Sequence, residues 1–318
     1  MISSKLRSCE TPWATSSQRE AGSPAINNNA IRYNKAVLPE TQNISLVLGV
    51  DIGRTKIACG LVDREAGVSG THRFPTRAAE GFDVSISQLW QAIEQSLTPE
   101  VGAIGICAPG PLNPKTGVIL NPPSLPGWTD IPLCDLAADR FGLPVSVEND
   151  CNAQALAEAR YGAGRGFENV FYSAIGTGIG SGIVLGGKIY HGKNGAAGEG
   201  GHMSIDYRSE TICGCGTPGC IETLASGSAL GRIGELDLDE LALRLAAWLG
   251  GILSLLDPDI VILGGGVTQI GEPLFQRIRA LVPGRTVNPW AASTPIVPAA
   301  LGEAAGILGA ASPFMRAY

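Results

Sequence analysis

The sequence contains little charge, and positive charge is the scarcer kind. Of its 318 residues only 16% are charged, with 23 Lys and Arg against 29 Asp and Glu, which gives a formal net charge of -6. Proteins that hold a nucleic acid backbone carry a basic patch or stripe, and this composition offers no excess of basic residues to build one. We therefore expect no nucleic acid partner.

Long hydrophobic runs are also missing. No apolar stretch reaches the roughly 18 residues that span a bilayer, and residues 1–40 lack the apolar segment of a secretory signal. We therefore expect a cytoplasmic protein with no membrane partner and with reduced cysteines. Five of its eight cysteines are scattered, and we interpret these as buried or incidental thiols: Cys9, Cys59, Cys107, Cys134 and Cys151.

Glycine, in contrast, is abundant. The chain has 43 glycines, about twice the usual share of roughly 7%, and they gather in short runs rather than in a repeat. Such runs are typical of tight turns that approach a ligand. Together with a hydrophobic content of 44%, the length predicts two domains or one bilobal unit.

The chain begins with a polar segment and then shows one plan twice. Residues 1–45 are rich in Ser, Asn and Thr without a hydrophobic period, which predicts a disordered tail. Residues 46–62 predict a strand, a glycine turn and a second strand, and residues 170–190 predict the same hairpin. This similarity indicates an internal duplication. Further predicted helices are 83–97, 133–141, 152–161, 239–256 and 302–311, and further strands are 101–107, 145–147 and 260–263.

One segment has the spacing of a metal site. His202, Cys213, Cys215 and Cys220 form the pattern His-x10-Cys-x-Cys-x4-Cys, with glycines between the cysteines. Three thiolates and one imidazole suit tetrahedral zinc, and the glycines let so short a loop fold around the ion. Because the protein would fill all four positions, we expect a structural zinc ion that does not activate water.

Two carboxylates flank this loop. Glu199 lies three residues before His202, and Glu222 lies two residues after Cys220. A lone glutamate is a solvated surface charge by default. Since a metal loop would fix the positions of both, the pattern favours a ligand-binding role.

Three glycine turns follow apolar strands and are candidates for phosphate binding: residues 51–56, 176–178 and 264–266. Such turns present backbone N–H groups to phosphate oxygens, and Asp51 can hold a metal-bound water. One glycine hairpin is a weak signal because these turns are common. Three of them, each at a strand end, favour a nucleotide clasped between two lobes.

A second acid closes the strand at 145–147. Asp150 follows Glu148 and Asn149, and a carboxylate at a strand end can accept a proton from a hydroxyl that attacks a phosphate. The alternative is a helix cap, because Asp is a favoured N-cap and a helical run follows. The local sequence does not decide between these two interpretations.

Taken together, these residues resemble the ROK family of sugar kinases and sugar-responsive repressors over about residues 46–311. The segments that carry the resemblance are LGVDIGRTKIACGLVD, VENDCNAQALAE, GTGIGSGIVLGGKIYHGKNGAAGEGGH and CGCGTPGCIET. The resemblance implies an α/β, bilobal, actin/hexokinase-like (ribonuclease H-like) fold with a duplicated domain. Residues 46–150 would form the N-terminal lobe, completed by the C-terminal helix 302–318, and residues 151–301 would form the C-terminal lobe.

The resemblance also implies an ATP-dependent hexose kinase, with glucose as the expected substrate, phosphorylated at its 6-hydroxyl. By motif, Asp150 resembles the general base, and the sugar ligands would be Asn149, Glu199, His202 and Glu222. ATP and its Mg²⁺ would be bound by Asp51, Gly53, Thr55, Lys56, Gly176, Thr177, Gly178, Gly264, Gly265 and Gly266. The partners are therefore ATP and a hexose or N-acetylhexosamine, and a homodimer is compatible with the family.

Some alternatives stay open at this level. Within the same class, N-acetylmannosamine or fructose could be the substrate; from other classes come a sugar-responsive repressor and a non-catalytic sugar sensor. Residues 1–45 show no helix pair or basic stripe of a DNA-binding module. Arg54 stands where the family has a second glycine, which puts a side chain into the first phosphate turn, either as an extra cation or as an obstruction. The stretch from Glu222 to Gly264 is short, which predicts a more open adenine side.

Overall fold

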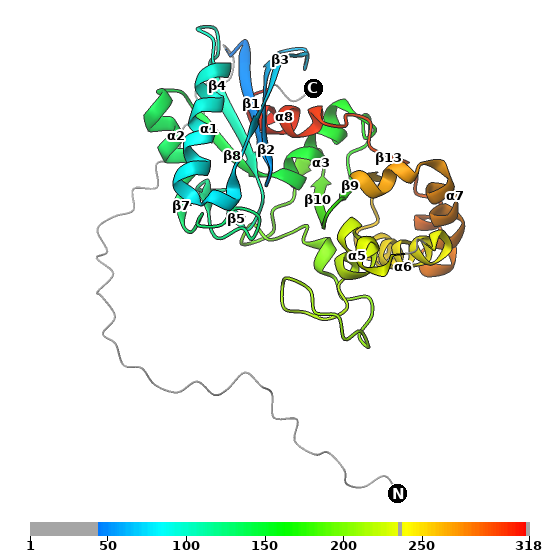
Figure 1. Cartoon of the computed structure of the whole chain (residues 1–318). Helices are drawn as coiled ribbons and strands as arrows, with labels where there is room; N and C mark the ends of the chain where they lie inside the picture. Colours follow the sequence, from blue (N-terminus) through cyan, green and yellow to red (C-terminus); the bar gives the residue numbers. More distant parts are fainter. Residues whose placement is uncertain (1–43, 235–236, 316–318) are drawn as a thin grey trace, which may run out of the picture. The chain divides into compact units, whose positions relative to one another are not determined.

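The computed structural model describes residues 44–234 and 237–315, so the predicted tail lies outside the described residues except for its last two. The described chain contains two five-stranded sheets (Figure 1). The first has the order β3-β2-β1-β4-β8, and the second has the order β11-β10-β9-β12-β13. The strands of the first are β1 Leu46–Ile52, β2 Lys56–Asp63, β3 Val68–Pro75, β4 Ala103–Ala108 and β8 Val145–Asn149; those of the second are β9 Val170–Ile175, β10 Ile179–Leu185, β11 Lys188–Ile189, β12 Ile260–Gly264 and β13 Ile296–Pro298.

The two sheets share one connectivity. In the first, β1 pairs antiparallel with β2 and parallel with β4, and β4 pairs parallel with β8. In the second, β9 pairs antiparallel with β10 and parallel with β12, and β12 pairs parallel with β13. The predicted fold class, with its duplicated domain, is confirmed. A small third sheet holds β5 Leu112–Asn113, β6 Val118–Ile119 and β7 Ile131–Pro132.

Each sheet has its own hydrophobic core. Trp128 and Leu89 are buried in the first, and Trp248 and Phe171 in the second. The helices that contribute to the first core are α1 Phe82–Ser96 and α2 Leu133–Phe141. The second half contains α4 Ile221–Ala225, α5 Gly227–Ile233, α6 Leu238–Leu256 and α7 Glu272–Leu281.

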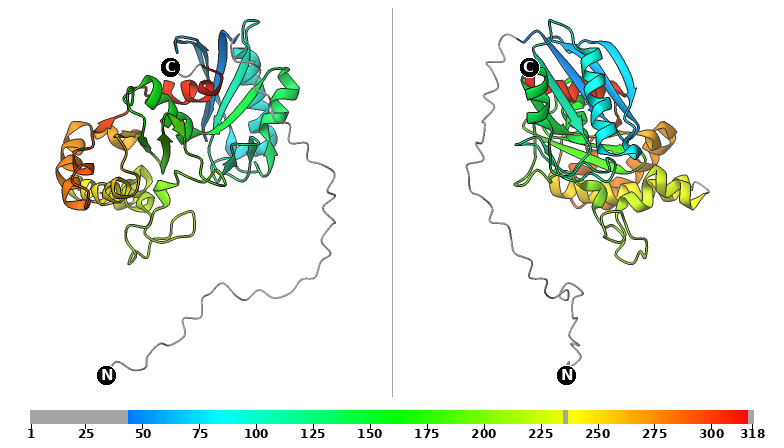
Figure 2. Two further views of the ribbon diagram at one scale, coloured as in Figure 1. Left: turned by 180° about the vertical axis from the view of Figure 1, so that it is seen from behind. Right: turned by 60° about the vertical axis from the view of Figure 1, so that its left-hand side comes forward.

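Two small-residue helices pack against each other and link the sheets. They are α3 Asp150–Tyr161, which also packs on β9 and β10, and α8 Ala304–Ala311, which packs on β1 and β4. A Cβ at Gly309 of α8 would overlap the Ala153 backbone of α3, so this close approach requires glycine. All views show α8, in red, beside the blue strands although it lies at the other end of the chain (Figures 1 and 2).

The predicted elements differ from the structure mainly at their ends. The helix 133–141 and the strand 170–175 have the predicted bounds, whereas α3 begins at Asp150 instead of residue 152. Sequence analysis missed β3, whose side chains are mostly exposed and show no alternation, and it missed α7. No helix in the described residues is long and apolar enough to cross a membrane.

Candidate active site

Asp51 lies near the end of β1, where its carboxylate faces the N-terminal half of α8. A Cβ at Gly306 would overlap this carboxylate, so a glycine in α8 leaves the room that it occupies. The Cys107 thiol of β4 donates to Asp51 Oδ1 over 3.4 Å. Burial raises the pKa of Asp51, although the Cys107 hydrogen bond and the charge of Lys56 oppose this effect.

Asp150 is the first residue of α3, and it is not the helix cap. The cap is Asn149, whose Oδ1 accepts from the backbone N–H groups of Cys151 and Asn152 over 2.9 and 3.1 Å. The alternative interpretation of Asp150 as an N-cap is therefore corrected, because Asn149 already satisfies those amides. The Asp150 carboxylate accepts from the Cys151 N–H over 2.8 Å and remains available for chemistry.

The electrostatics of this acid suit a base. Burial raises the pKa of the Asp150 carboxyl to about 7, with further contributions from the negative charges of Asp51 and Glu199. Asp51 and Asp150 are both half-buried, and the two negative charges disfavour each other's ionisation. A divalent cation would relieve this repulsion, and carboxylate oxygen is the donor that Mg²⁺ prefers. The residues present therefore fit a Mg²⁺ ion.

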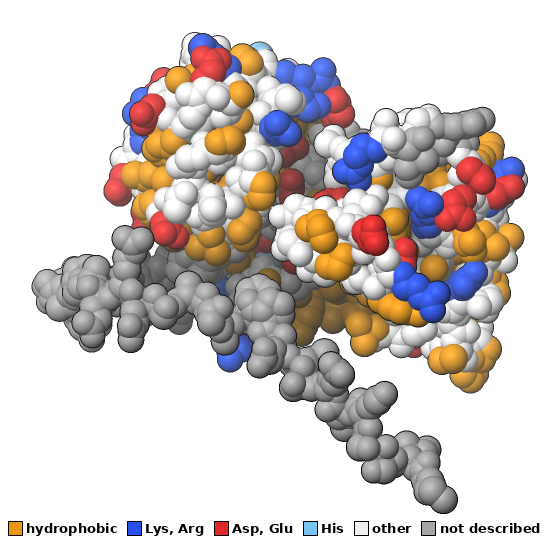
Figure 3. All heavy atoms as spheres, turned by 60° about the horizontal axis from the view of Figure 1, so that its bottom comes forward, with side chains coloured by type: hydrophobic (Ala, Val, Ile, Leu, Met, Phe, Trp, Pro, Cys, Tyr) orange, Lys and Arg blue, Asp and Glu red, His pale blue; other side chains and the backbone are white. Residues whose placement is uncertain are grey.

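A cavity of about 720 Å³ brings residues of both halves together. Of the predicted nucleotide residues, Asp51, Lys56 and Gly264 to Gly266 line it. Gly265 has a φ of 89°, and a Cβ there would crowd the backbone of Ile175, so only glycine fits. The space-filling view shows a hollow between two rounded masses of the surface, with acidic side chains inside it (Figure 3).

The other predicted phosphate residues lie outside the lining of this cavity in the described structure: Gly53, Thr55, Gly176, Thr177 and Gly178. The first turn is closed by a hydrogen bond from the Gly53 N–H to the Lys56 carbonyl, at 2.8 Å. Arg54 at its tip is exposed to solvent. Unlike Lys56, Arg54 is not among the residues that line the cavity.

The four predicted zinc ligands come together. The ligand atoms of His202, Cys213, Cys215 and Cys220 all lie within 4.8 Å of one another. His202 Nδ1 lies 3.5 Å from Cys213 Sγ, and Cys215 Sγ lies 3.6 Å from Cys220 Sγ. Tetrahedral bonds of about 2.1 to 2.3 Å place ligand atoms about 3.5 to 3.8 Å apart, so the donor set fits zinc.

The carboxylates beside this loop face in two directions. Glu199 Oε2 lies 4.0 Å from His202 Nε2, the ring nitrogen that is turned away from the cysteines. Glu222 Oε2 accepts from the Ile179 N–H over 2.9 Å, and Glu222 Oε1 lies 3.5 Å from Cys213 Sγ. Glu222 thereby joins the thiol loop to the first residue of β10.

Several residues at the site were missed by sequence reasoning. Glu303, which precedes α8, accepts from Lys56 over 2.8 Å and also from Arg73, and all three line the cavity. His191 Nε2 lies 2.7 Å from Glu148 Oε2. The partners are 247 and 43 residues apart along the chain, so no local pattern could have revealed them. Tyr172 and Gln154, joined by a hydrogen bond of 2.8 Å, also line the cavity.

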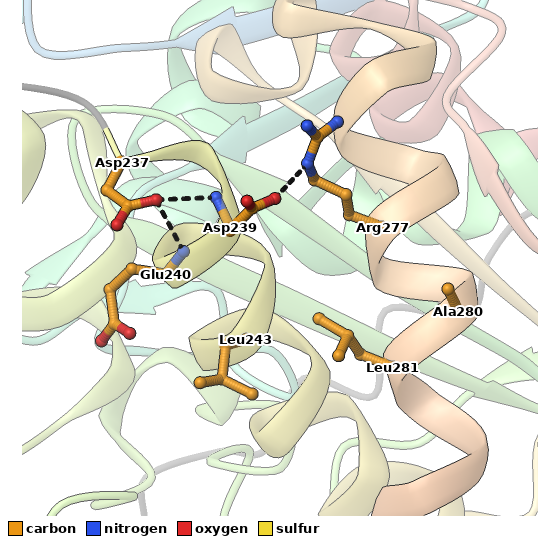
Figure 4. A pocket seen from close by; sticks show the side chains of 7 residues that line it. All are labelled: Asp237, Asp239, Glu240, Leu243, Arg277, Ala280 and Leu281. Atoms are coloured by element: carbon orange, nitrogen blue, oxygen red, sulfur yellow. Dashed lines mark hydrogen bonds and ion pairs between the residues drawn. The ribbon is translucent and has the colours of Figure 1, made fainter.

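A second groove, of about 460 Å³, lies between the start of α6 and α7 (Figure 4). Asp237 caps α6 by accepting from the backbone of Asp239 and Glu240, and Arg277 pairs with Asp239. Its floor is apolar and includes Leu243. The groove contains none of the predicted site residues, so the cavity between the sheets is the candidate active site.

Comparisons with known proteins identify similar sequences and structures. A family model described as the ROK family matches residues 47–239 and 234–316. A glucokinase from Streptomyces coelicolor is 34% identical over 315 residues, with 84% of this chain and 97% of the relative covered. A xylose repressor from Bacillus spizizenii is 30% identical, with 83% and 76% covered. The crystal structure of a ROK family glucokinase from Streptomyces griseus in complex with glucose and AMPPNP is 33% identical, with a TM-score of 0.74 and with 85% and 99% covered.

Proposed function

This chain belongs to the ROK family and is an ATP-dependent sugar kinase, and we propose that it phosphorylates glucose at the 6-hydroxyl. The observation that carries the proposal is the Asp150 carboxylate, half-buried at the start of α3 with a pKa of about 7. A base poised near the working pH takes up a hydroxyl proton most effectively. The similar glucokinases named above support glucose as the acceptor.

In this mechanism Asp150 accepts the proton of the sugar hydroxyl as the hydroxyl oxygen attacks the γ-phosphorus of ATP. The bond from that phosphorus to the bridging β–γ oxygen breaks, and ADP is the leaving group. The cavity beside Asp51 receives the nucleotide, with Lys56 at the phosphates and the backbone of Gly264 to Gly266 at the adenosine. Asp51 would hold Mg²⁺, which would supply positive charge to neutralise the phosphates. The turns at 51–56 and 176–178 would contact the phosphates when the two halves close on the ligands.

We propose that the sugar is held by four side chains. Asn149 precedes the base directly, and Glu199 lies close enough to raise its pKa. His202 presents Nε2 on the side of Glu199, and Glu222 is fixed by the Ile179 N–H. Carboxylates and an imidazole offer the acceptors and donors that sugar hydroxyls need. In this arrangement the hydrogen bonds of the sugar hydroxyls orient the sugar, and Asp150 accepts the proton.

We propose further that His202, Cys213, Cys215 and Cys220 bind one structural zinc ion. The support is the donor set and its spacing, since all four positions are supplied by protein. His202 would then act twice, through Nδ1 on zinc and Nε2 toward the sugar. Metal analysis of the purified full-length protein should find about one zinc per chain; a zinc-free protein with full activity would contradict this assignment.

The kinase proposal is tested by a coupled assay of ATP consumption over glucose, mannose, fructose, allose and N-acetylated hexosamines. Glucose should give the highest kcat/KM. A clear preference for N-acetylmannosamine or fructose would move the chain to the alternative within the class. If the protein binds a sugar but none of these sugars leads to ATP consumption, a sensor or repressor would be favoured.

A further inference from the structure

Glu148 is a buried residue that precedes Asn149 and Asp150 in the sequence. Its side chain is only 12% exposed at the end of β8. Glu148 Oε1 accepts from the Asn149 N–H over 2.9 Å and from Asn152 Nδ2 over 3.1 Å. Both donors flank Asp150 in sequence, so this one oxygen fixes the path of the chain from β8 into α3.

The other oxygen of Glu148 reaches the second half of the molecule. His191 Nε2 lies 2.7 Å from Glu148 Oε2, and His191 follows β11 of the second sheet. The hydrogen bond to Glu148 raises the pKa of His191, while nearby Lys115 opposes this. Hydrogen bonds to an ionised, buried partner are the strong ones, because losing such a partner leaves the charge desolvated and unpaired.

His191 also begins the loop that ends in Glu199. The His191 carbonyl accepts from the Ala197 N–H over 3.2 Å, which closes the loop on itself. The far end is held to the second core: Ser181 Oγ donates to the Gly198 carbonyl over 2.6 Å, and Trp248 Nε1 donates to the Gly200 carbonyl over 3.0 Å. Positive φ angles at Gly192, Gly195 and Gly198 mark a backbone that depends on such anchors.

We propose that the His191–Glu148 pair positions the sugar site, because it ties the loop that carries Glu199 to the turn that carries Asp150. The pair joins two segments from different sheets at the point where the sugar must touch both. His191 and Glu148 act through Glu199 and Asp150 and are positioning residues. This inference rests on the proposed sugar kinase function and assigns to that site a determinant of sugar affinity.

The consequence is a selective loss of sugar affinity. Without His191 the Glu199 loop keeps its anchor on the second core but loses its tie to β8. We expect His191→Ala to raise the KM for glucose about tenfold, the equilibrium equivalent of one hydrogen bond to a charged group. The KM for ATP should stay within about twofold, because the contacts of the nucleotide cavity are unchanged.

The experiment compares variants of the full chain by steady-state kinetics in both substrates and by thermal unfolding. His191→Gln is the conservative variant, since its amide can still donate to Glu148, and it should restore most of the glucose affinity. His72→Ala on β3 is the matched control, because His72 is exposed on the other half of the molecule, and it should resemble wild type. In a double-mutant cycle with Glu148→Gln, the double variant should be no worse than His191→Ala alone.

The outcomes separate this inference from the proposed function. If the wild-type protein does not consume ATP with any of the sugars, the proposed function fails before the variants are compared. If wild type is active and His191→Ala keeps the wild-type KM for glucose, the positioning role is wrong. A purely structural role would instead lower the Tm and move both KM values together, without rescue by His191→Gln, and this result would also overturn the inference.

Discussion

The first sheet ends in carboxylates, whereas the second ends in glycines. Asp51 lies near the end of β1 and Asp150 directly follows β8, while β9 leads into Gly176 and β12 ends at Gly264. The same strand order thus produces two kinds of strand end, of which Asp51 and Gly264 line the cavity while Asp150 and Gly176 lie outside its lining. The carboxylates offer charge for a cation and a proton, and the glycines offer backbone that a phosphate or sugar can approach closely.

A second contrast lies between these buried acids and the thiol loop. Asp51 and Asp150 are held by helices and strands that pack against the two cores. Their raised pKa values show that this environment disfavours the ionised carboxylates. The loop at 203–219 consists mostly of turns; Met203 and Ile205 at its start pack against the second core, whereas Tyr207 and Ile212 are exposed. With little core of its own, the loop depends on its ligand set for order. In the proposed mechanism the acids do the chemistry, and the loop positions the sugar side chains.

The largest expected effect is the loss of turnover on replacing Asp150. Asp150→Asn should lower kcat by about 10² to 10⁴-fold while leaving glucose binding nearly intact, because the amide keeps the shape but cannot accept the proton. The folded pKa of Asp150 is raised, so its ionised form opposes folding above pH 7 and this penalty disappears as the pH falls. The variant should therefore match or exceed the wild-type Tm at pH 8.

The matched control for this variant is Asp139→Asn, at an exposed position of α2. It makes the same change of charge away from the site, so its kcat and Tm should stay at wild-type values. Steady-state kinetics, glucose binding by calorimetry and thermal unfolding measure the three quantities. Wild-type turnover in Asp150→Asn would show that another group is the base.

The next largest effect is on the thiol loop. Cys220→Ser should lose zinc, lower the Tm and raise the KM for glucose by about 10²-fold, because a displacement of 1 Å in positioning groups can cost that much. Elemental analysis, thermal unfolding and kinetics check these outcomes together. Cys134→Ser, in α2 and outside the cluster, is the control that should keep the metal. Zinc loss with an unchanged KM for glucose would mean that the loop does not position the sugar ligands.

A smaller effect comes from pH. Because the Asp150 carboxyl has a pKa of about 7 and acts as the carboxylate, kcat/KM for glucose should fall about tenfold per pH unit below that value. The profile of kcat at saturating Mg²⁺ and ATP should be shifted to lower pH, since a nearby cation favours the charged form. A kcat/KM that stays flat from pH 8 to pH 5 would contradict the assignment of Asp150 as the base.

The sequence predicted what depends on local pattern. The proposed zinc ligands fall within nineteen residues, and the apolar runs of β1 and β9 end in glycine turns, so both could be recognised from spacing. It did not predict β3, because an exposed edge strand without alternation has no hydrophobic period. The helix start at Asp150 was also missed, since only the structure shows that the Asn149 side chain reaches both amides.

Contacts between distant segments could not be predicted from the sequence for a different reason. Glu148 belongs to a recognisable motif, but its partner His191 is an isolated histidine in a glycine-rich loop. Likewise, Glu303 joins Lys56 and Arg73 only because α8 returns to the first sheet. Such pairs follow from topology, and a single sequence does not specify which distant side chains its topology brings together.

The smallest expected effect is on the KM for ATP, and it compares the glycine turn at 51–56 with the one at 176–178. Arg54→Gly gives the first turn a second glycine, as the second turn already has. The backbone at Arg54 does not require glycine, because its φ is not among the positive ones. Its guanidinium is exposed, and an exposed cation contributes little to binding a nearby anion and is screened by salt. The KM for ATP should therefore rise by about twofold at low salt and return to wild type at 0.5 M salt. A tenfold change in either direction would show that Arg54 enters the phosphate site when ATP binds.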